Sequence, residues 1–280
     1  MRRTVLFLLA ACVLLTAGGF AHADKPLKIV VVTGGHGFQK EPFVKMFQSF
    51  KGIEFVHHEL PKDTCDVFED VSKWDYDAIV LYNMSQPITD KQKANFLSLL
   101  DKGVGLVALH HCIAAFEPWP EFPKIIGGRF YRKQNKARPA GQPLSKPAHG
   151  VMMDIKVVDT EHPVTAGVKD FTIKDEAYKN QVFQKDNHIL LTCDNPASDK
   201  PIAWTRSYRS SRVCYIELGH DQIAYTDANY RKLLTNAIRW TVAGPAAPKA
   251  GALNVPPAGF KALFNGKDLT GWKALVVTPR

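Results

Sequence analysis

Strand-like and helix-like segments alternate through the first half of the chain, and this order constrains the fold more than any other feature. Residues 27–32, 53–57, 78–82 and 105–109 are short, largely apolar runs bounded by turn residues, as buried parallel strands are. A repeated order of strand, helix and strand is typical of a parallel sheet with right-handed crossovers. The sequence therefore predicts an α/β fold with a mostly parallel sheet.

Two of the segments between these strands have helix signals. Phe43, Met46 and Phe47 recur at helical spacing in the first segment. In the second, Thr89 is a good helix N-cap and Gly103 marks the C-terminal stop. We expect both helices to bury their apolar faces against the sheet.

The strand and helix order breaks after Ala114. Residues 118–150 are rich in proline, glycine and basic residues, and a loop of this length inside a compact domain is usually functional or disordered. Later segments predict an edge or antiparallel strand, three more strands and a closing amphipathic helix; they are residues 151–157, 188–192, 202–205, 212–218 and 230–242.

The N-terminus has the three regions of a secretory signal peptide. Two arginines precede the apolar segment 5–15, and Ala21-His22-Ala23 is a small-x-small cleavage site. We expect residues 1–23 to be removed and the mature chain to be secreted or periplasmic. Leu9-Ala10-Ala11-Cys12 leaves a lipoprotein as the alternative, with a hydrophobic region of only about seven residues. No other segment approaches the ~18 apolar residues of a membrane span.

Composition divides the rest of the chain into one principal domain and a tail. Residues 27–243 are long enough for an α/β domain with a full core. Residues 244–257 are rich in proline, alanine and glycine, as interdomain linkers are. Residues 258–280 are too few to fold alone, so we expect them to be the incomplete start of a second domain or a tail docked on the first.

The charge of the chain argues against a nucleic-acid partner. The formal net charge of +9 falls to +7 without Arg2 and Arg3, and residues 129–138 are the only local concentration of basic side chains. A nucleic-acid-binding protein usually has a basic stripe with interleaved stacking aromatics. We interpret residues 129–138 as a solvated loop or as the rim of a site for an anionic substrate.

Four cysteines remain after residue 23, namely Cys65, Cys112, Cys193 and Cys214. Four cysteines in a domain of this size do not form a disulfide scaffold. We expect at most one disulfide, with Cys193 and Cys214 on neighbouring strands as the candidate pair.

Histidines follow three of the predicted strands. His36 lies in a glycine-rich loop that matches neither a dinucleotide nor a Walker fingerprint, so it is either a substrate or metal loop or an ordinary turn. His110 and His111 follow residues 105–109, and His220 follows the strand over 212–218. Because open α/β sheets bind ligands beyond the carboxyl ends of their strands, we expect these histidines to converge at one edge.

Adjacent side chains at a strand end diverge, so we expect one of His110 and His111 to face the site and the other to support the fold. Cys112 as a nucleophile is the alternative. It would require an activated thiolate on an exposed, strained turn with small residues on both sides, and His110 stands on one of those sides.

Acidic and phenolic side chains gather in Asp175-Glu176-Ala177-Tyr178, after a short apolar segment. They can supply a general acid or base and a contact to a substrate hydroxyl, or they form a solvated acidic turn. Glu176 and Asp175 are candidate catalytic residues beside His110 and His111. The candidate substrate contacts are His36, Tyr178, Arg129, His220 and Asp221.

A metal ion is a further expectation. His36, His110 and His220 would supply three separated nitrogen ligands, with a carboxylate such as Glu176 beside them. Such a set suits zinc or manganese with an open position for water. The sequence has no compact ligand motif such as a helical histidine pair, so a site without metal stays open.

Several segments together resemble the ThuA-like, trehalose-utilisation family over roughly residues 28–243. The resemblance rests on Gly105 to His111, Gly127-Gly128-Arg129-Phe130, His162-Pro163-Val164 to Gly167, Asp175 to Tyr178, and Gly219-His220-Asp221. It implies a flavodoxin-like, three-layer sandwich similar to class I glutamine amidotransferase domains. It also implies a role in the metabolism of disaccharides oxidised at a sugar 3-position.

The tail from Phe264 to Trp272 resembles the opening strand of the 3-keto-disaccharide hydrolase domain, a β-sandwich. Only the beginning of that domain is present, so it carries over no active residue. Its fusion to the first domain implies the same class of sugars.

The leading hypothesis is an exported enzyme that hydrolyses, eliminates or isomerises 3-keto glycosides. A ketone acidifies the neighbouring C–H bond, and histidine, which titrates near neutral pH, can remove that proton. One alternative is a non-catalytic carbohydrate-binding module with Trp119, Tyr131 and Trp204 as stacking platforms. Another is an amidase-like hydrolase that depends on Cys112. The oligomeric state does not follow from the sequence.

Overall fold

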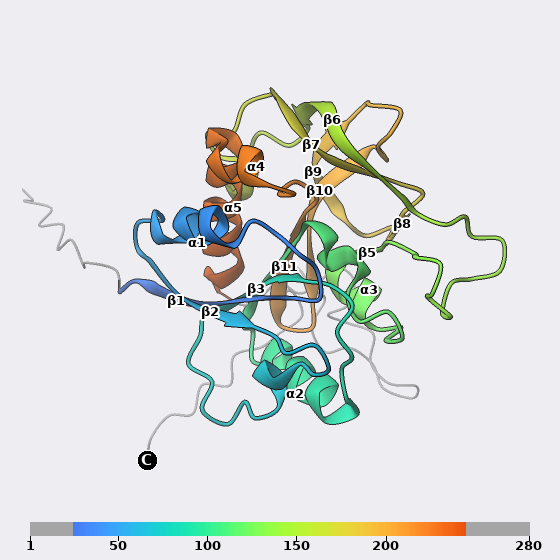
Figure 1. Ribbon diagram of the computed structural model, residues 1–280. Coiled ribbons are helices and arrows are strands. Elements are labelled where there is room, and N and C mark those ends of the chain that lie inside the picture. The colour runs from blue at the N-terminus through green and yellow to red at the C-terminus, as the bar shows by residue number, and fades with distance from the viewer. Residues whose placement is uncertain (1–24, 245–280) are drawn as a thin grey trace, which may run out of the picture.

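The computed structural model describes residues 25–244, which form one α/β domain (Figure 1). The expected signal peptide over 1–23 and the expected second domain over 258–280 lie outside the described residues. The expected linker over 244–257 lies outside them as well, apart from Gly244. No helix within residues 25–244 is long and apolar enough to cross a membrane.

A nine-stranded sheet forms the centre of the domain, in the order β2-β1-β3-β4-β11-β10-β9-β6-β7. The first five strands in this order are all parallel to one another. They are β1 (Leu27–Gly34), β2 (Ile53–Glu59), β3 (Ala78–Asn83), β4 (Gly105–Leu109) and β11 (Ser211–Ile216). Because β11 takes the fifth position, this half has the 2-1-3-4-5 strand order of flavodoxin-like folds. The predicted fold class is confirmed.

The other half of the sheet is antiparallel and larger than the sequence predicts. Its strands are β10 (Pro201–Tyr208), β9 (His188–Cys193), β6 (Lys146–Val157) and β7 (Phe171–Lys179). β6 begins inside the segment expected to be loop, and its pairing with β7 shifts register between Ala148 and Val151. A small separate sheet pairs β5 (Gly128–Arg129) with β8 (Val182–Phe183).

Helices cover both faces of the parallel half, which gives the three predicted layers (Figure 1). One face packs against α1 (Lys40–Gln48), α4 (Gln222–Thr226) and α5 (Ala228–Val242). The other packs against α2 (Asp90–Asp101) and α3 (Phe122–Ile126). Three 3-10 helices complete the domain: η1 (Asp66–Phe68), η2 (His110–Ala114) and η3 (Pro163–Thr165).

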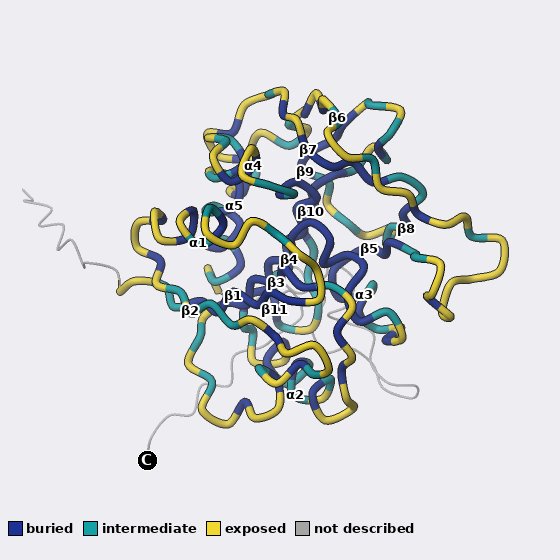
Figure 2. The backbone as a smooth tube through the Cα atoms, viewed as in Figure 1, coloured by how far each residue is buried: buried dark blue, intermediate teal, exposed yellow. Residues whose placement is uncertain are grey.

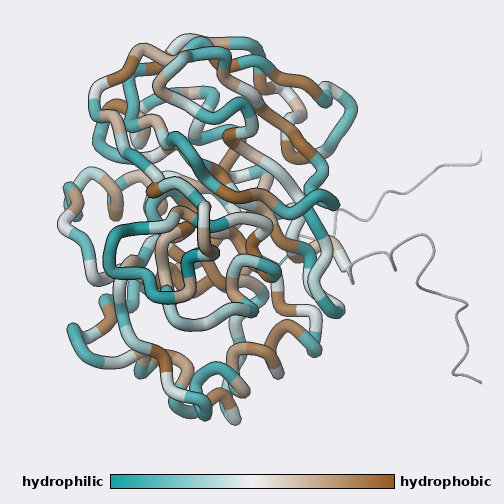
Figure 3. Tube along the Cα trace, turned by 90° about the vertical axis from the view of Figure 1, so that its right-hand side faces the viewer, coloured by the Kyte–Doolittle hydropathy of each residue, from teal (hydrophilic) through white to brown (hydrophobic). Residues whose placement is uncertain are grey.

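Alternate residues of the strands enter the two cores, as the period of a β-strand requires. In β1, Ile29 and Val31 join one core while Val30 and Val32 join the other. Figure 2 shows β3, β4 and β11 as the largely buried centre of the parallel half, while most residues of β2 at its edge are exposed or intermediate. Figure 3 shows hydrophilic segments along much of the outer surface. Thr89 caps α2 with a complete capping box, as its position predicts.

The predicted disulfide is wrong. Cys193 lies on β9 and Cys214 on β11, and β10 runs between these two strands. All four cysteines of the described segment are buried free thiols.

The predicted stacking platforms are wrong for both tryptophans. Trp204 is fully buried, and its indole N–H donates to the carbonyl of Ile126 at 2.8 Å. Trp119 is also buried, against Phe96 and Phe122. Neither ring is available to stack on a sugar.

Candidate functional site

A pocket of about 160 Å³ opens beyond the carboxyl ends of β1, β3 and β4. It thus lies at the point of the parallel half where the strand order reverses, which is the usual ligand position in such sheets. Strand ends of the parallel half supply one wall, and β6 and β7 supply the other. The lining residues are His36, Met84, His111, Ile113, Ala114, Phe130, Arg132, Pro147, His149, Glu176 and Tyr178.

His110 is the first residue of η2, on the strained turn that directly follows β4. Its φ is +51°, a conformation that is uncommon for a non-glycine residue. Strained strand-to-helix turns of this kind present nucleophiles in hydrolases, but here the strained residue is a histidine, two positions before Cys112. The ring is fully buried, and its Nδ1 lies 2.7 Å from the carbonyl oxygen of Glu217. Since a carbonyl only accepts hydrogen bonds, Nδ1 carries the hydrogen.

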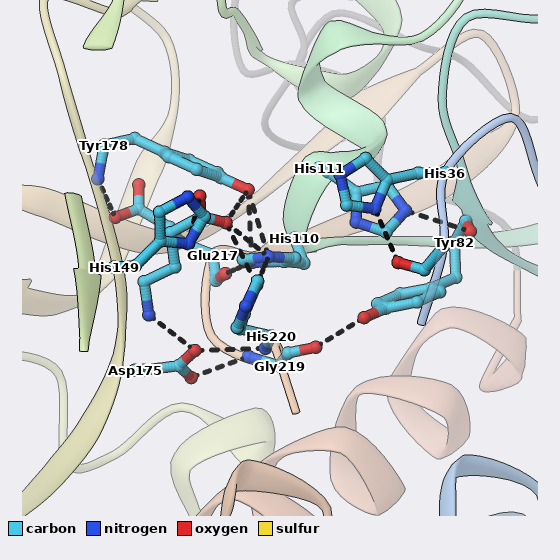
Figure 4. Close-up of polar contacts among 12 residues, drawn as sticks. His36, Tyr82, His110, His111, His149, Asp175, Tyr178, Glu217, Gly219 and His220 are labelled. Carbon is cyan, nitrogen blue, oxygen red and sulfur yellow. Dashed lines mark hydrogen bonds and ion pairs between the residues drawn. The ribbon is translucent and has the colours of Figure 1, made fainter. Parts of the chain in front are cut away.

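Glu176, on β7, is the centre of the site. Its partners His110, His149, Tyr178 and His220 lie close together in Figure 4. Its Oε2 lies 2.9 Å from Nε2 of His110, 3.2 Å from Nδ1 of His220 and 3.1 Å from the hydroxyl of Tyr178. Its Oε1 lies 3.1 Å from Nδ1 of His149. Burial would raise the pKa of Glu176, but hydrogen bonds and charge from His110 and His220 hold it well below its usual range. Glu176 is therefore an anion in a ring of histidines.

Asp175 supports this arrangement from behind. Its carboxylate is buried and accepts three main-chain N–H bonds, from Glu176 at 2.8 Å, Gly219 at 2.8 Å and His220 at 3.0 Å. These bonds tie the turn after β11 to β7. Because both oxygens are used in this way and neither lines the pocket, Asp175 is a positioning residue.

His36 and His111 form the opposite wall of the pocket. Their rings stack with centroids 4.7 Å apart. Nε2 of His111 lies 3.3 Å from the carbonyl oxygen of Tyr82, and burial lowers the pKa of His111 well below its usual range. His111 is therefore a neutral imidazole whose Nδ1 keeps a lone pair. Both histidines of the 110–111 pair therefore belong to the site, since His111 lines the pocket and His110 contacts Glu176. The expectation that one of the two would only support the fold is wrong.

The structure separates the expected metal ligands. His110 and His220 meet, with Nε2 and Nδ1 3.3 Å apart. His36 does not reach them, because β3 lies between β1 and β4 and the His36 ring rests on His111 instead. Within residues 25–244, the group of side chains that could hold a metal ion is His110, Glu176 and His220.

Two of the expected substrate contacts lie away from the pocket. Arg129 is buried, and its guanidinium donates to the carbonyls of Ala115 and Trp119. Asp221 caps the N-terminus of α4 by accepting from the N–H of Ile223 at 2.8 Å. Both side chains are engaged in holding local structure.

Cys112 is not placed as a nucleophile. Its side chain is fully buried, packs within the core and does not line the pocket. Burial raises the pKa of its thiol far above the usual range. The geometry therefore does not support the amidase-like alternative.

A family model for trehalose utilisation, ThuA, matches residues 28–241. The chain belongs to the ThuA family. Its fold is similar to that of a ThuA-like protein from Parabacteroides merdae, with a TM-score of 0.67 and 21% identity over 85% of this chain and 97% of that one. A ThuA-like protein from Bacteroides uniformis has a TM-score of 0.52 and 23% identity, over 79% of this chain and 93% of that one.

A cytoplasmic protein from Salmonella typhimurium has a TM-score of 0.52 and 12% identity, over 77% of this chain and 99% of that one. These likenesses show that the chain shares the α/β fold of these three proteins. No curated protein matches the sequence.

The sequence patterns assign no individual role to three residues that the structure places at or beside this ThuA-family site. His149 and Arg132 lie within the proline- and glycine-rich segment 118–150, whose composition marks a functional loop without singling out either residue. Glu217 directly follows β11, where it is fully buried and accepts from the N–H of Tyr178 at 3.2 Å and the side-chain amide of Gln181 at 2.7 Å. Burial raises the pKa of Glu217 well above its usual range.

Proposed function

We propose that this ThuA-family chain is a sugar-converting enzyme that moves a proton at the carbon next to the ketone of an oxidised glycoside. The observation that carries the proposal is the position of Glu176. Glu176 lies on the wall of the pocket, where one of its oxygens orients His149 and the other contacts His110, His220 and Tyr178. The matching family model describes trehalose utilisation, and this supports a sugar as the substrate.

The pocket favours one sugar ring. Its volume of about 160 Å³ is below the ~300–1,000 Å³ of pockets that enclose drug-sized ligands. Phe130 and Pro147 offer apolar surface for the ring, and the lone pairs and N–H groups of the surrounding imidazoles can bind its hydroxyls. The second ring of a disaccharide would extend over the rim.

His149 is the residue we assign as the base. Its Nδ1 lies 3.1 Å from Oε1 of Glu176, so Nδ1–H donates to the carboxylate and Nε2 keeps a lone pair. This is the arrangement in which a carboxylate orients a histidine for general base catalysis. Its side chain is two-thirds exposed at the mouth of the pocket, where it can reach a bound sugar.

The proposed proton transfer can be completed by residues that line the pocket. Nε2 of His149 takes the proton, the C–H bond breaks, and its electron pair moves to the ketone oxygen as an enolate. Arg132, which lines the same pocket and pairs with Glu117, would donate hydrogen bonds from the rest of its guanidinium to that oxygen. When the enolate collapses, the neighbouring glycosidic C–O bond breaks and the departing oxygen takes the proton back from His149, which completes an elimination. Return of the proton to carbon instead gives an isomer.

Solvent exchange tests this proposal directly. Purified protein is incubated with 3-keto-trehalose in D₂O, and NMR follows deuterium at the carbons next to the ketone. We expect enzyme-dependent exchange or elimination that is lost in His149→Gln and retained in His188→Gln, a control histidine outside the pocket that pairs with Asp159. If keto-glycosides acquire no deuterium and give no product, the proposed function is wrong.

We also propose that the chain acts outside the cytoplasm. The support is the charged, apolar and small-residue order of residues 1–23, which lie outside the described residues.

A further inference from the structure

We propose that His110, Glu176 and His220 bind a divalent transition-metal ion through Nε2, Oε2 and Nδ1 respectively, and that Zn²⁺ is the ion this set fits best. The site adjoins the pocket of the proposed function. It stands on its own geometry, however, and is tested without any sugar.

The spacing of the three donor atoms fits one ion. The distances are 2.9 Å from His110 to Glu176, 3.2 Å from His220 to Glu176 and 3.3 Å between the two imidazole nitrogens. With metal–ligand bonds of about 2.1 Å, adjacent donors lie about 3.0 Å apart in an octahedron and about 3.4 Å apart in a tetrahedron. All three edges fall in or next to this range, so an ion can contact the three atoms without moving their backbones.

The tautomer of His110 is the one that a metal ligand needs. Nδ1–H donates to the carbonyl of Glu217 at 2.7 Å, so in the neutral ring Nε2 has a lone pair, directed at Glu176 and His220. Histidine ligands of metal ions usually donate their other N–H to a carbonyl or carboxylate in this way. The hydroxyl of Tyr178 lies 3.1 Å from Nε2 and 3.3 Å from Nδ1 of His110. Because it is nearly equidistant from the two nitrogens, it lies over the face of the imidazole ring and leaves the in-plane lone pair of Nε2 free.

The turn that carries His220 is held from two sides. Asp175 accepts the main-chain N–H groups of Gly219 and His220, and the hydroxyl of Tyr82 donates to the carbonyl of Gly219 at 2.7 Å (Figure 4). Together with the strained φ of His110, these contacts fix both imidazoles before any ligand arrives. Strain and pre-organisation of this kind are concentrated at functional sites.

The hydrogen-bonding requirements of the three donor atoms also favour an ion. Without one, a hydrogen on each imidazole nitrogen can bond to Oε2 of Glu176, but the two N–H groups then face each other with their nitrogens only 3.3 Å apart. A cation accepts lone pairs from all three at once. Two histidines and one glutamate with an open fourth position form a known catalytic zinc set, and the same donors with more open positions also suit Fe²⁺.

Metal binding to the whole chain decides the proposal. Protein stripped with EDTA is titrated calorimetrically with Zn²⁺, Mn²⁺ or, without oxygen, Fe²⁺, and its Co²⁺ form is examined by visible absorption. We expect one ion per chain and a Co²⁺ spectrum of a four- or five-coordinate site. His220→Gln, at a partly exposed position, and Glu176→Gln should each weaken binding at least about 100-fold, with folding checked by thermal unfolding.

The controls separate this site from its neighbours. His36→Gln and His188→Gln should bind the ion as the unmodified chain does, because His36 rests on His111 and His188 pairs with Asp159. Absence of stoichiometric binding, or unchanged binding by folded His220→Gln, overturns the metal site. Tight Zn²⁺ binding without deuterium exchange would refute only the proposed function, and exchange by EDTA-treated protein that binds no ion would refute only the metal site.

Discussion

Nε2 of His110 lies 2.9 Å from Oε2 of Glu176, although four strands lie between β4, which His110 follows, and β7, which carries Glu176, in the order of the sheet. The two halves of the sheet must therefore approach each other at this end. Direct bonds between β7 and the turn after β11 show the same closeness, since Asp175 accepts from the N–H of Gly219 at 2.8 Å. The site is a seam at which the antiparallel half of the sheet closes over the carboxyl edge of the parallel half.

Gly219 is required in the turn of this seam. Its φ is +122°, and a Cβ atom there would lie 2.5 Å from the hydroxyl of Tyr230. We expect Gly219→Ala to lower the free energy of unfolding by about 2–5 kcal/mol, from backbone strain together with overpacking. Gly141→Ala is the matched control, because Gly141 has a φ of +79° but nothing within 4 Å of the added atom. Equal losses in the two variants, measured by chemical denaturation, would exclude a role for the Tyr230 contact.

Arg129 is expected to stabilise the fold without serving the site. Burial lowers the pKa of its guanidinium to about 10, which leaves it charged at neutral pH. Arg129→Met removes the donors of two buried carbonyls, at Ala115 and Trp119, so we expect a loss of about 2 kcal/mol or more. Arg209→Met, which breaks an exposed pair with Asp101, should cost less than about 1 kcal/mol. Zn²⁺ affinity should be unchanged in both variants.

The cysteines of the folded protein should resist alkylation. Burial raises the pKa of Cys65 to about 12 and that of Cys112 further, so both remain protonated thiols at pH 8, where only a thiolate reacts. Iodoacetamide should therefore modify none of the four cysteines of the described segment in the native state, and all of them in guanidinium chloride, as read by mass spectrometry. Because both thiols are buried and are still almost entirely protonated at pH 9, native labelling should remain negligible across the range from pH 7 to 9. Rapid modification of Cys112 would restore the thiol mechanism.

The parallel half of the fold could be predicted because local sequence patterns specify its strands. Each buried strand is an apolar run, and turn residues mark its ends, so the histidines at three carboxyl ends could be placed on one edge. Local pattern does not say how far apart those ends lie. His36 follows β1, and β3 stands between β1 and β4, so His36 reaches His111 and not His110.

The contribution of β6 could not be predicted in the same way. His149 reaches Glu176 only because β6 begins early and shifts register against β7 between Ala148 and Val151. Register and sheet curvature depend on long-range pairing, which single-sequence periodicity does not encode. The sequence indicates Asp175 and Glu176 as candidate catalytic residues. It does not indicate that Glu176 lies in the site and Asp175 behind it, because this difference also depends on the pairing of β6 with β7.

The proposed export predicts a defined mature N-terminus. Expressed with its own leader in a bacterium, the chain should be recovered from the periplasm or medium beginning at Asp24, as N-terminal sequencing would show. A mature chain that begins at a lipidated Cys12 would support the lipoprotein alternative. Recovery of the intact Met1 form from the cytoplasm alone would contradict export.

Asp175→Asn is the sharpest test of the support behind the site. An asparagine keeps the shape but presents one oxygen and one NH₂ group to the three main-chain N–H groups that Asp175 now binds, so at least one donor loses its acceptor. We expect a loss of stability of about 1–3 kcal/mol. Because the turn that carries His220 then loosens, we also expect Zn²⁺ binding to weaken about 10- to 100-fold. Asp221→Asn is the matched control, since asparagine caps a helix as well as aspartate does and Asp221 lies outside the pocket. Calorimetric titration of both folded variants distinguishes the outcomes, and unchanged Zn²⁺ affinity in Asp175→Asn would show that Asp175 supports the fold but does not position His220.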